Sequence, residues 1–318
     1  MSASIALPFP QSIASHKGVW LAMLSAVGFS AKAIFVKLAY QYHVDPITLL
    51  TLRMLCALPF FLWMALGRPR DRGYARFGCS AWLGLIVLGL LGYYLASVFD
   101  FIGLQYISSA LERLVLYLYP TFVLLFSVWF FRRQIRQQDF AALLLCYAGI
   151  GLAVMHDWRY ALSGQEVLIG VLWVLACAVS YALYLVGAGE LVKRLGAIQM
   201  AAWAGIVSTL AIVVHFLVSQ PLSNLIQPLP VYGYALAMGT LSTVLPVVLM
   251  NEAMRMIGAN RMAMVSTLGP MVTLILGWAF LGEALSMTQM MGATLVVGGV
   301  IVVNLKELPS FMVNGHHA

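Results

Sequence analysis

Charged side chains are scarce in this sequence. Asp, Glu, Lys and Arg make up 9% of the 318 residues and 62% are hydrophobic, whereas a soluble domain carries about 25% charged residues. The polar coat that water requires is absent, which excludes a soluble protein. Apolar runs close to the roughly 20 residues that cross a bilayer recur instead, without the period-two alternation of a transmembrane β-barrel. The sequence therefore predicts an all-α integral membrane protein.

Cysteines and nucleotide-binding motifs are also sparse. The four cysteines have neither a metal-site nor a CxxC spacing, so we expect free thiols; they are Cys56, Cys79, Cys146 and Cys177. No Ser/His/Asp arrangement or pair of catalytic carboxylates is recognisable, and there is no P-loop or Gly-x-Gly-x-x-Gly motif. These absences predict a protein that is not an enzyme, holds no metal or cofactor, and does not use ATP by itself.

Hydropathy predicts ten membrane-spanning helices with short connections. They cover about residues 18–40, 46–67, 80–103, 111–131, 138–156, 166–188, 198–219, 231–254, 261–282 and 287–305. Two sets of five spans follow, in residues 18–156 and 166–305, joined by an external linker at 157–165. Residues 1–17 and 306–318 are expected to be cytoplasmic tails.

The net charge of +7 reflects topology and not a nucleic-acid surface. If the N-terminus lies in the cytoplasm, thirteen Lys and Arg residues fall at the cytoplasmic ends of the predicted spans and three at their outer ends. The positive-inside rule favours this orientation. The thirteen are Lys17, Arg68, Arg70, Arg72, Arg76, Arg132, Arg133, Arg136, Lys193, Arg194, Arg255, Arg261 and Lys306, against Lys37, Arg113 and Arg159. We therefore expect a multi-pass protein of the bacterial inner (plasma) membrane with both termini in the cytoplasm.

The two halves repeat one pattern at an offset of 150 residues. Without a gap, the matched pairs include Ser30 with Ser180, Gly89 with Gly239, Pro120 with Pro270, and Gly149 with Gly299. Proline and glycine fix helix kinks and close helix contacts, so their coincidence indicates a duplicated fold. Because five spans are an odd number, the repeats are predicted to be inverted relative to each other, as in many secondary transporters.

These features resemble the drug/metabolite transporter superfamily, specifically its ten-helix EamA-type members. The resemblance covers about residues 18–305. It rests on the stretches 28–31, 103–110 and 281–283, on Arg53 and Pro120, and on Gly292, Gly298 and Gly299. It implies a transporter of amino acids, related metabolites or drugs without naming the cargo. The Trp usual before Gly28 in this family is Val27 here.

Lys32 is the leading candidate for contact with a substrate. An ionisable group inside a span costs about 2.5–3.5 kcal/mol on insertion scales and by default indicates function. Lys32 lies about 22 Å along the helix from Lys17, at 1.5 Å per residue. The side chain either faces a central cavity or extends to the outer interface near Lys37.

Arg53 is the second cation inside a span, and it could clamp a carboxylate through two hydrogen bonds. A structural ion pair with Asp100 is the competing interpretation. Glu112 and Arg113 open the fourth predicted span as a helix-end pair or gate. Asp100 and Glu112 are also the places where a coupling proton could act.

The second half differs in charge, because Ala182 and Trp203 occupy the positions of Lys32 and Arg53. Further candidates for a binding site are Ser180, Tyr184, Trp203 and Tyr117. Asn251 and Glu252 are expected either at a cytoplasmic gate or on a solvated face near Arg255. Pro120 and Pro270 are predicted to break spans four and nine and so to expose backbone carbonyls to a cavity.

The sequence thus predicts a secondary active transporter, an exporter, that carries amino-acid-like zwitterions or organic anions by alternating access. Its partners would be a small-molecule substrate, the lipid bilayer and a possible coupling proton; oligomeric state is open. Two alternatives remain, namely a multidrug exporter of hydrophobic cations and a non-transporting membrane receptor or assembly protein.

Overall fold

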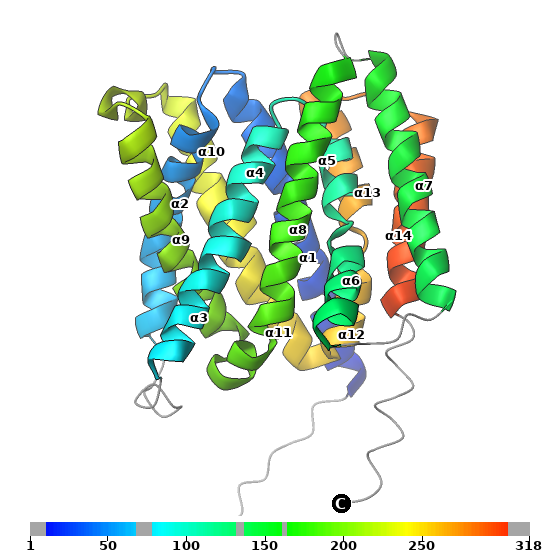
Figure 1. Ribbon diagram of the computed structural model, residues 1–318, viewed down its shortest axis with the longest axis horizontal. Helices are drawn as coiled ribbons and strands as arrows, with labels where there is room; N and C mark the ends of the chain where they lie inside the picture. The colour runs from blue at the N-terminus through cyan, green and yellow to red at the C-terminus, as the bar shows by residue number, and fades with distance from the viewer. Residues whose placement is uncertain (1–10, 68–77, 132–136, 161–163, 305–318) are drawn as a thin grey trace, which may run out of the picture.

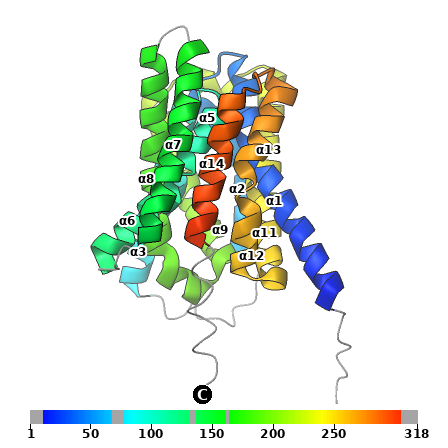
Figure 2. The ribbon, with the colours of Figure 1, turned by 90° about the vertical axis from the view of Figure 1, so that its right-hand side faces the viewer.

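The protein is a bundle of helices, seen in a computed structural model that describes residues 11–67, 78–131, 137–160 and 164–304. The described residues contain helices and turns and no strand. The N-terminal end of α1 and the C-terminal end of α14 lie at the same end of the bundle (Figures 1 and 2). We call this end the termini end.

The described residues of the first half contain seven helices and one π-helical turn. They are α1 (Gln11–Tyr40), α2 (Pro46–Leu66), α3 (Cys79–Gly89), the π-turn η2 (Leu90–Leu95), α4 (Ala96–Gly103), α5 (Ser109–Leu116), α6 (Tyr119–Phe131) and α7 (Gln137–Tyr160). η2 joins α3 and α4 without a loop, and a two-residue turn separates α5 from α6.

The second half, residues 166–305, repeats this series. Its elements are α8 (Gly164–Leu195), α9 (Ala197–Ser219), the 3₁₀ turn η3 (Leu222–Leu225), α10 (Leu229–Gly239), the π-turn η4 (Thr240–Val244), α11 (Leu245–Ile257), α12 (Ala259–Ser266), α13 (Gly269–Leu276), the π-turn η5 (Gly277–Leu281) and α14 (Met287–Asn304).

The interruptions of the helices recur at the 150-residue offset. η2 begins at residue 90 and η4 at residue 240, while α5 and α12 end at residues 116 and 266. Pro120 and Pro270 occupy the second positions of α6 and α13, where a proline lacks the N–H that would continue the preceding helix. The duplication predicted from the sequence is therefore present in the backbone.

Seven helical stretches are long and apolar enough to cross a membrane. Among the described residues they are His16–Tyr40, Pro46–Leu66, Ala81–Gly103, Ser109–Phe130, Gly164–Gly189, Ala197–Ser219 and Leu229–Ile257. Shorter apolar helices occupy Leu143–Trp158, Gly269–Leu281 and Met287–Ile301. These ten stretches coincide with the ten predicted spans, but length and composition support seven crossings, so ten crossings and the cytoplasmic location of the termini stay predictions.

The two halves are interleaved. α1 packs chiefly against α11, α2 against α9, α4 against α8, and α7 against α14, and each of these pairs joins one helix of each half. Figures 1 and 2 both show α7 beside α14. The largest hydrophobic core, which includes Leu49, Phe61, Phe101, Ala202 and Met238, likewise draws on both halves.

Glycines set the closest helix contacts, including the contact between α7 and α14. A Cβ added to Gly149 would overlap the carbonyl oxygen of Gly292, and a Cβ on Gly292 would overlap that of Gly149. Gly89 of α3 fits against α9, and its repeat partner Gly239 of α10 fits against α2. Small residues therefore let the backbones touch where lipid provides no hydrophobic drive between helices.

We expect Gly149→Ala to lower the free energy of unfolding by roughly 1–3 kcal/mol, because the methyl group forces α7 away from α14. Gly151 is the matched control: it lies two residues further along the same helix and on a different face, and a Cβ there meets nothing within 4 Å. Thermal unfolding in detergent should show a loss for Gly149→Ala and none for Gly151→Ala. Equal melting temperatures would contradict the glycine contact.

Cys79 offers a test of the predicted orientation. It is exposed at the first turn of α3, at the termini end. With the termini in the cytoplasm, a membrane-impermeant maleimide should label Cys79 in inside-out vesicles and not in intact cells. Labelling of Cys79 from outside would reverse the assignment, and Cys79→Ser controls for labelling at the other thiols.

Candidate functional site

Three helices bring a lysine and two carboxylates together inside the bundle. Lys32 Nζ of α1 lies 2.6 Å from Asp100 Oδ2 of α4 and 4.0 Å from Glu112 Oε1 of α5. Asp100 is 1% and Glu112 0% exposed, and the Lys32 side chain is 16% exposed. We call Lys32, Asp100 and Glu112 the intramembrane charge cluster.

The local structure explains how these side chains meet. Asp100 lies one turn before the end of α4 and Glu112 one turn after the start of α5, so the connection at residues 104–108 returns the chain past Lys32. Lys32 itself is eight residues, about 12 Å, from the end of α1 at Tyr40. The cluster therefore lies in the part of the bundle away from the termini end.

Arg113 ties the cluster to the second half. Its Nε donates to Thr273 Oγ1 of α13 over 3.2 Å, and its Nη2 donates to the carbonyl of Phe29 on α1. Thr273 Oγ1 in turn donates to the Gly269 carbonyl over 3.1 Å. Arg113 is therefore an internal connector between α5, α1 and α13, and its hydrogen bonds go to these helices and not to Glu112. A gate at Glu112 and Arg113 stays a prediction.

Arg53 does not form the expected ion pair with Asp100. Its Nε and Nη2 donate to Thr243 Oγ1 over 3.2 and 3.1 Å, and its guanidinium carbon lies 5.4 Å from the centre of the Phe101 ring. Asp100 forms its ion pair with Lys32 instead. Among the described residues Arg53 Nη1 has no hydrogen-bond partner, although the side chain is buried.

The charges of this region do not balance among themselves. Three cations, Lys32, Arg53 and Arg113, face two carboxylates, Asp100 and Glu112. The Glu112 carboxyl lies against that of Asp100 and 4.0 Å from Lys32 Nζ. Buried charges are costly unless each is paired and hydrogen-bonded, so the region has unused capacity for a charged ligand.

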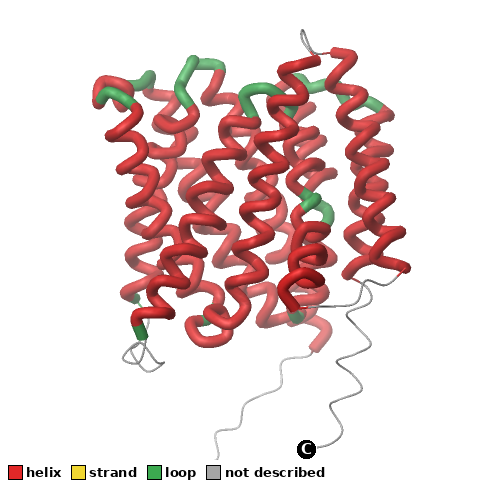
Figure 3. The backbone as a smooth tube through the Cα atoms, viewed as in Figure 1, coloured by secondary structure: helices red, strands yellow, loops and turns green. Residues whose placement is uncertain are grey.

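The two helix breaks contact each other. Pro270 cannot donate to the carbonyl of Ser266, and the Tyr117 hydroxyl, from the break between α5 and α6, donates to that carbonyl instead. Ser30 Oγ donates to the carbonyl of Gly269 over 3.1 Å. The break between α5 and α6 is visible as a short turn within the bundle (Figure 3). The expectation that the second break leaves these carbonyls free is therefore wrong, since side chains of the first half occupy them.

Tyrosine rings form a continuous row from this break to η2. Successive ring centroids are 6.1 Å apart for Tyr117–Tyr119, 5.2 Å for Tyr119–Tyr181, 5.8 Å for Tyr181–Tyr184 and 5.6 Å for Tyr184–Tyr93. Tyr117 and Tyr184 of the predicted site thus belong to one aromatic row with Tyr119, Tyr181 and Tyr93.

The remaining predicted residues lie apart from the charge cluster. Ser180 Oγ donates to the Leu91 carbonyl in η2 over 2.7 Å, and Trp203 packs edge-on against Trp82 at 5.3 Å. Asn251 bonds the Val247 carbonyl of its own helix. Glu252 forms an exposed ion pair with Arg255, which agrees with a solvated face.

A second polar cluster, missed by the sequence analysis, lies where α4 connects to α5. Glu283 accepts hydrogen bonds from the Ser109 backbone and side chain, and Asp157 accepts from the Ser108 backbone and from Gln289. The only sequence signal was the Leu281-Gly282-Glu283 stretch of the family resemblance.

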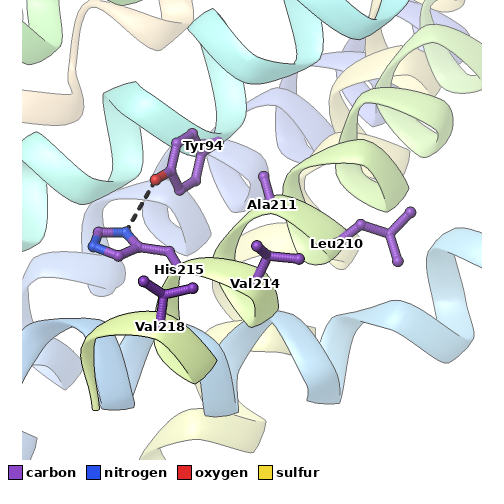
Figure 4. A pocket seen from close by; sticks show the side chains of 6 residues that line it. All are labelled: Tyr94, Leu210, Ala211, Val214, His215 and Val218. Carbon is purple, nitrogen blue, oxygen red and sulfur yellow. Dashed lines mark hydrogen bonds between the residues drawn. The ribbon is translucent and has the colours of Figure 1, made fainter.

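A shallow groove of about 470 Å³ opens on the side of the bundle between η2 and α9. Figure 4 shows its lining residues, with the Tyr94 hydroxyl 3.0 Å from His215 Nδ1; they are Tyr94, Leu210, Ala211, Val214, His215 and Val218. It contains none of the predicted binding residues, and Leu210, Val214 and Val218 are exposed. The groove is therefore separate from the charge cluster.

Comparison with known proteins identifies the fold and family. The model of the EamA-like transporter family matches residues 16–155 and again 168–305. The chain belongs to the EamA-like transporter family. An uncharacterized transporter, YcbK, from Bacillus subtilis is 33% identical over 296 residues, covering 90% of this chain and 91% of that protein.

Other relatives of this EamA-like transporter agree. An uncharacterized transporter from Archaeoglobus fulgidus is 25% identical, covering 88% of this chain and 93% of its own. A solved structure titled "Crystal structure of protein" matches with a TM-score of 0.64 at 20% identity, covering 92% of this chain and 98% of its own, which supports the fold alone. The chain is thus a multi-pass membrane protein with a transporter role.

Substitutions of Lys32 and Asp100 should have non-additive effects on the stability of the protein. Replacing one partner of a buried ion pair costs roughly 3–5 kcal/mol, because the other charge is left uncompensated. We expect Lys32→Met and Asp100→Asn each to lower the melting temperature in detergent, and the double variant to lose less than the sum of the two. Additive losses would contradict the pair; Glu252→Gln, which breaks only an exposed ion pair, is the control.

Proposed function

We propose that this EamA-like transporter is a secondary active exporter of small metabolites that carry a carboxylate, either amino-acid-like zwitterions or organic anions. The observation that supports this proposal is the intramembrane charge cluster. Ionisable groups buried in spans mark substrate or ion pathways by default, and the cluster offers both signs of charge on helices that end or break nearby.

A carboxylate has two candidate donors in this region. Arg53 Nη1 is a buried N–H group without a partner, and Lys32 can turn from Asp100 to a ligand. A guanidinium is suited to planar, bidentate recognition of a carboxylate. The excess of one cation over the carboxylates favours a ligand with at least one negative group.

An ammonium group of a zwitterion would have its own partners. Glu112 and Asp100 are acceptors buried beside Lys32, and release of Asp100 by Lys32 would free one of them. The ligand would then replace the internal ion pair with two external ones. Such an exchange limits the cost of breaking the Lys32–Asp100 contact, which a neutral ligand could not offset.

Alternating access would use the discontinuous helices. The breaks after α5 and α12 and the π-turns η2 and η4 are positions where a helix can bend, and transporters commonly place binding sites at such breaks. Because the main helix contacts join opposite halves, the moving bodies would combine spans of both halves.

A proton gradient is the proposed energy source. Asp100 and Glu112 are carboxyls buried near the proposed substrate, and a proton carried by either would couple the two fluxes. Binding and release would then depend on pH on both sides of the membrane.

The same carboxylates favour a second candidate function, the export of hydrophobic cations. Glu112 is a fully buried carboxyl beside Asp100, and the aromatic row from Tyr117 to Tyr93 provides ring faces that attract cations. Lys32 and Arg53 oppose this interpretation by repulsion. We therefore rank it second.

Flux in proteoliposomes tests the proposal. A screen of amino acids, organic anions and quaternary ammonium compounds, with and without a pH gradient, should find a carboxylate-bearing substrate whose flux the gradient accelerates. Lys32→Met/Asp100→Asn should reduce that flux by at least about tenfold, equivalent to roughly 1.4 kcal/mol. The double variant should stay folded, because removing both charges leaves neither of them buried without its partner. Lys17→Met, an exposed lysine on the same helix, should transport normally.

Normal flux in the folded double variant would show that the pair is structural and that the substrate binds elsewhere. Flux of quaternary ammonium compounds alone, lost in Glu112→Gln and retained in Lys32→Met/Asp100→Asn, would favour the second candidate function.

A further inference from the structure

The contact between Glu283 and the start of α5 holds the charge-bearing helix in place. Ser109 N donates to Glu283 Oε1 over 2.9 Å and Ser109 Oγ donates to Oε2 over 2.7 Å. Both oxygens of one carboxylate are thereby engaged by one residue, and Ser109 is fully buried. Hydrogen bonds to an ionised acceptor are about twice as strong as neutral ones.

The backbone around Glu283 is shaped for this contact. η5 ends at Gly282, whose φ of 68° is a left-handed conformation that favours glycine, and the Glu283 N–H returns to the Gly277 carbonyl. A Cβ on Gly277 would lie 2.7 Å from Glu283 Oε2 and 2.8 Å from Ser109 Oγ. Two glycines therefore make room for the carboxylate and turn it toward α5.

A second carboxylate reinforces the same helix end. Asp157 Oδ2 accepts from Ser108 N over 3.1 Å, while Asp157 Oδ1 accepts from Gln289 over 3.1 Å. Ser108 Oγ caps Leu111 N. Anionic groups are favourable at a helix N-terminus, so Glu283 and Asp157 together fix the first turn of α5.

α5 links this contact to the charge cluster. It is eight residues long, isolated by the 104–108 connection on one side and by the break at 117–118 on the other. Glu112 and Arg113 lie one turn beyond Ser109, and they contact Lys32 and Thr273 respectively. A movement of the first turn must therefore displace both charged side chains.

We propose that Glu283 is a positioning residue for transport: its carboxylate locks the N-terminus of α5, sets Glu112 and Arg113 in the charge cluster, and closes the side of the transporter opposite the termini until the contact with Ser109 breaks. The structure then represents a state closed on that side. The link from this lock to substrate rests on the proposed function of the cluster, but the lock itself can be tested without a substrate.

The test uses cysteine accessibility in the full-length protein. The four native cysteines are replaced by Ala, and Ala110→Cys places a reporter in the buried first turn of α5. A membrane-impermeant maleimide is applied to right-side-out and inside-out vesicles. Ala202→Cys, a buried position of α9, reports general loosening of the fold.

We expect Glu283→Ala to raise labelling of Ala110→Cys by about tenfold, the shift that 1.4 kcal/mol would give, and only in the vesicles that present the face opposite the termini. Ala202→Cys should stay protected. Glu283→Gln, which keeps an acceptor for Ser109 N and a polar partner for Ser109 Oγ, should restore most of the protection. Glu252→Ala, which removes an exposed carboxylate, should change nothing.

Unchanged labelling of Ala110→Cys in Glu283→Ala would overturn the proposal. Labelling that rises equally in both vesicle types, or equally at Ala202→Cys, would show a purely structural carboxylate and overturn it as well. If the lock behaves as expected while Lys32→Met/Asp100→Asn transports normally, the gate stands and the proposed substrate site fails.

Discussion

Polar groups inside a bilayer have no water to bond, and this constraint organises the whole bundle. An unbroken helix satisfies its own backbone, but every break or π-turn frees carbonyl groups that need another donor. Here side chains on other helices supply the donors: Tyr117 bonds the Ser266 carbonyl, Ser30 that of Gly269, and Ser180 that of Leu91. The breaks that permit motion are therefore also points where helices from opposite halves are tied together.

The same constraint explains the asymmetry of the repeat. The scaffold of the two halves is alike, down to the residues at which η2 and η4 begin and α5 and α12 end. The charged residues of the cluster, in contrast, come from the first half, as do Arg53 and Arg113, whose hydroxyl partners Thr243 and Thr273 come from the second. In this region one copy thus carries the charged side chains and the other provides hydroxyl acceptors, a division that lets a symmetric scaffold hold one asymmetric site.

Charged side chains contact α5 at two positions along its length. Glu112 and Arg113 belong to the buried region, and Ser108 and Ser109, one turn away, are held by Asp157 and Glu283. A short helix that bears both a site and a lock can couple the occupancy of one to the state of the other, because the eight residues of α5 move as one rigid helix.

Sequence alone determined the membrane environment, the helical class, the 150-residue repeat and the identity of the unusual residues. These depend on composition and local periodicity, and a charge or a proline inside an apolar run is conspicuous without any fold. Pairing was decided only by the tertiary structure. The sequence suggested an ion pair between Asp100, three residues from the end of α4, and Arg53. In the structure, the turn at 104–108 and the course of α1 place Asp100 beside Lys32, and these two residues form the ion pair. Glu283 lies 174 residues from Ser109, and no local pattern can encode a contact that arises only when helices of the two halves interleave.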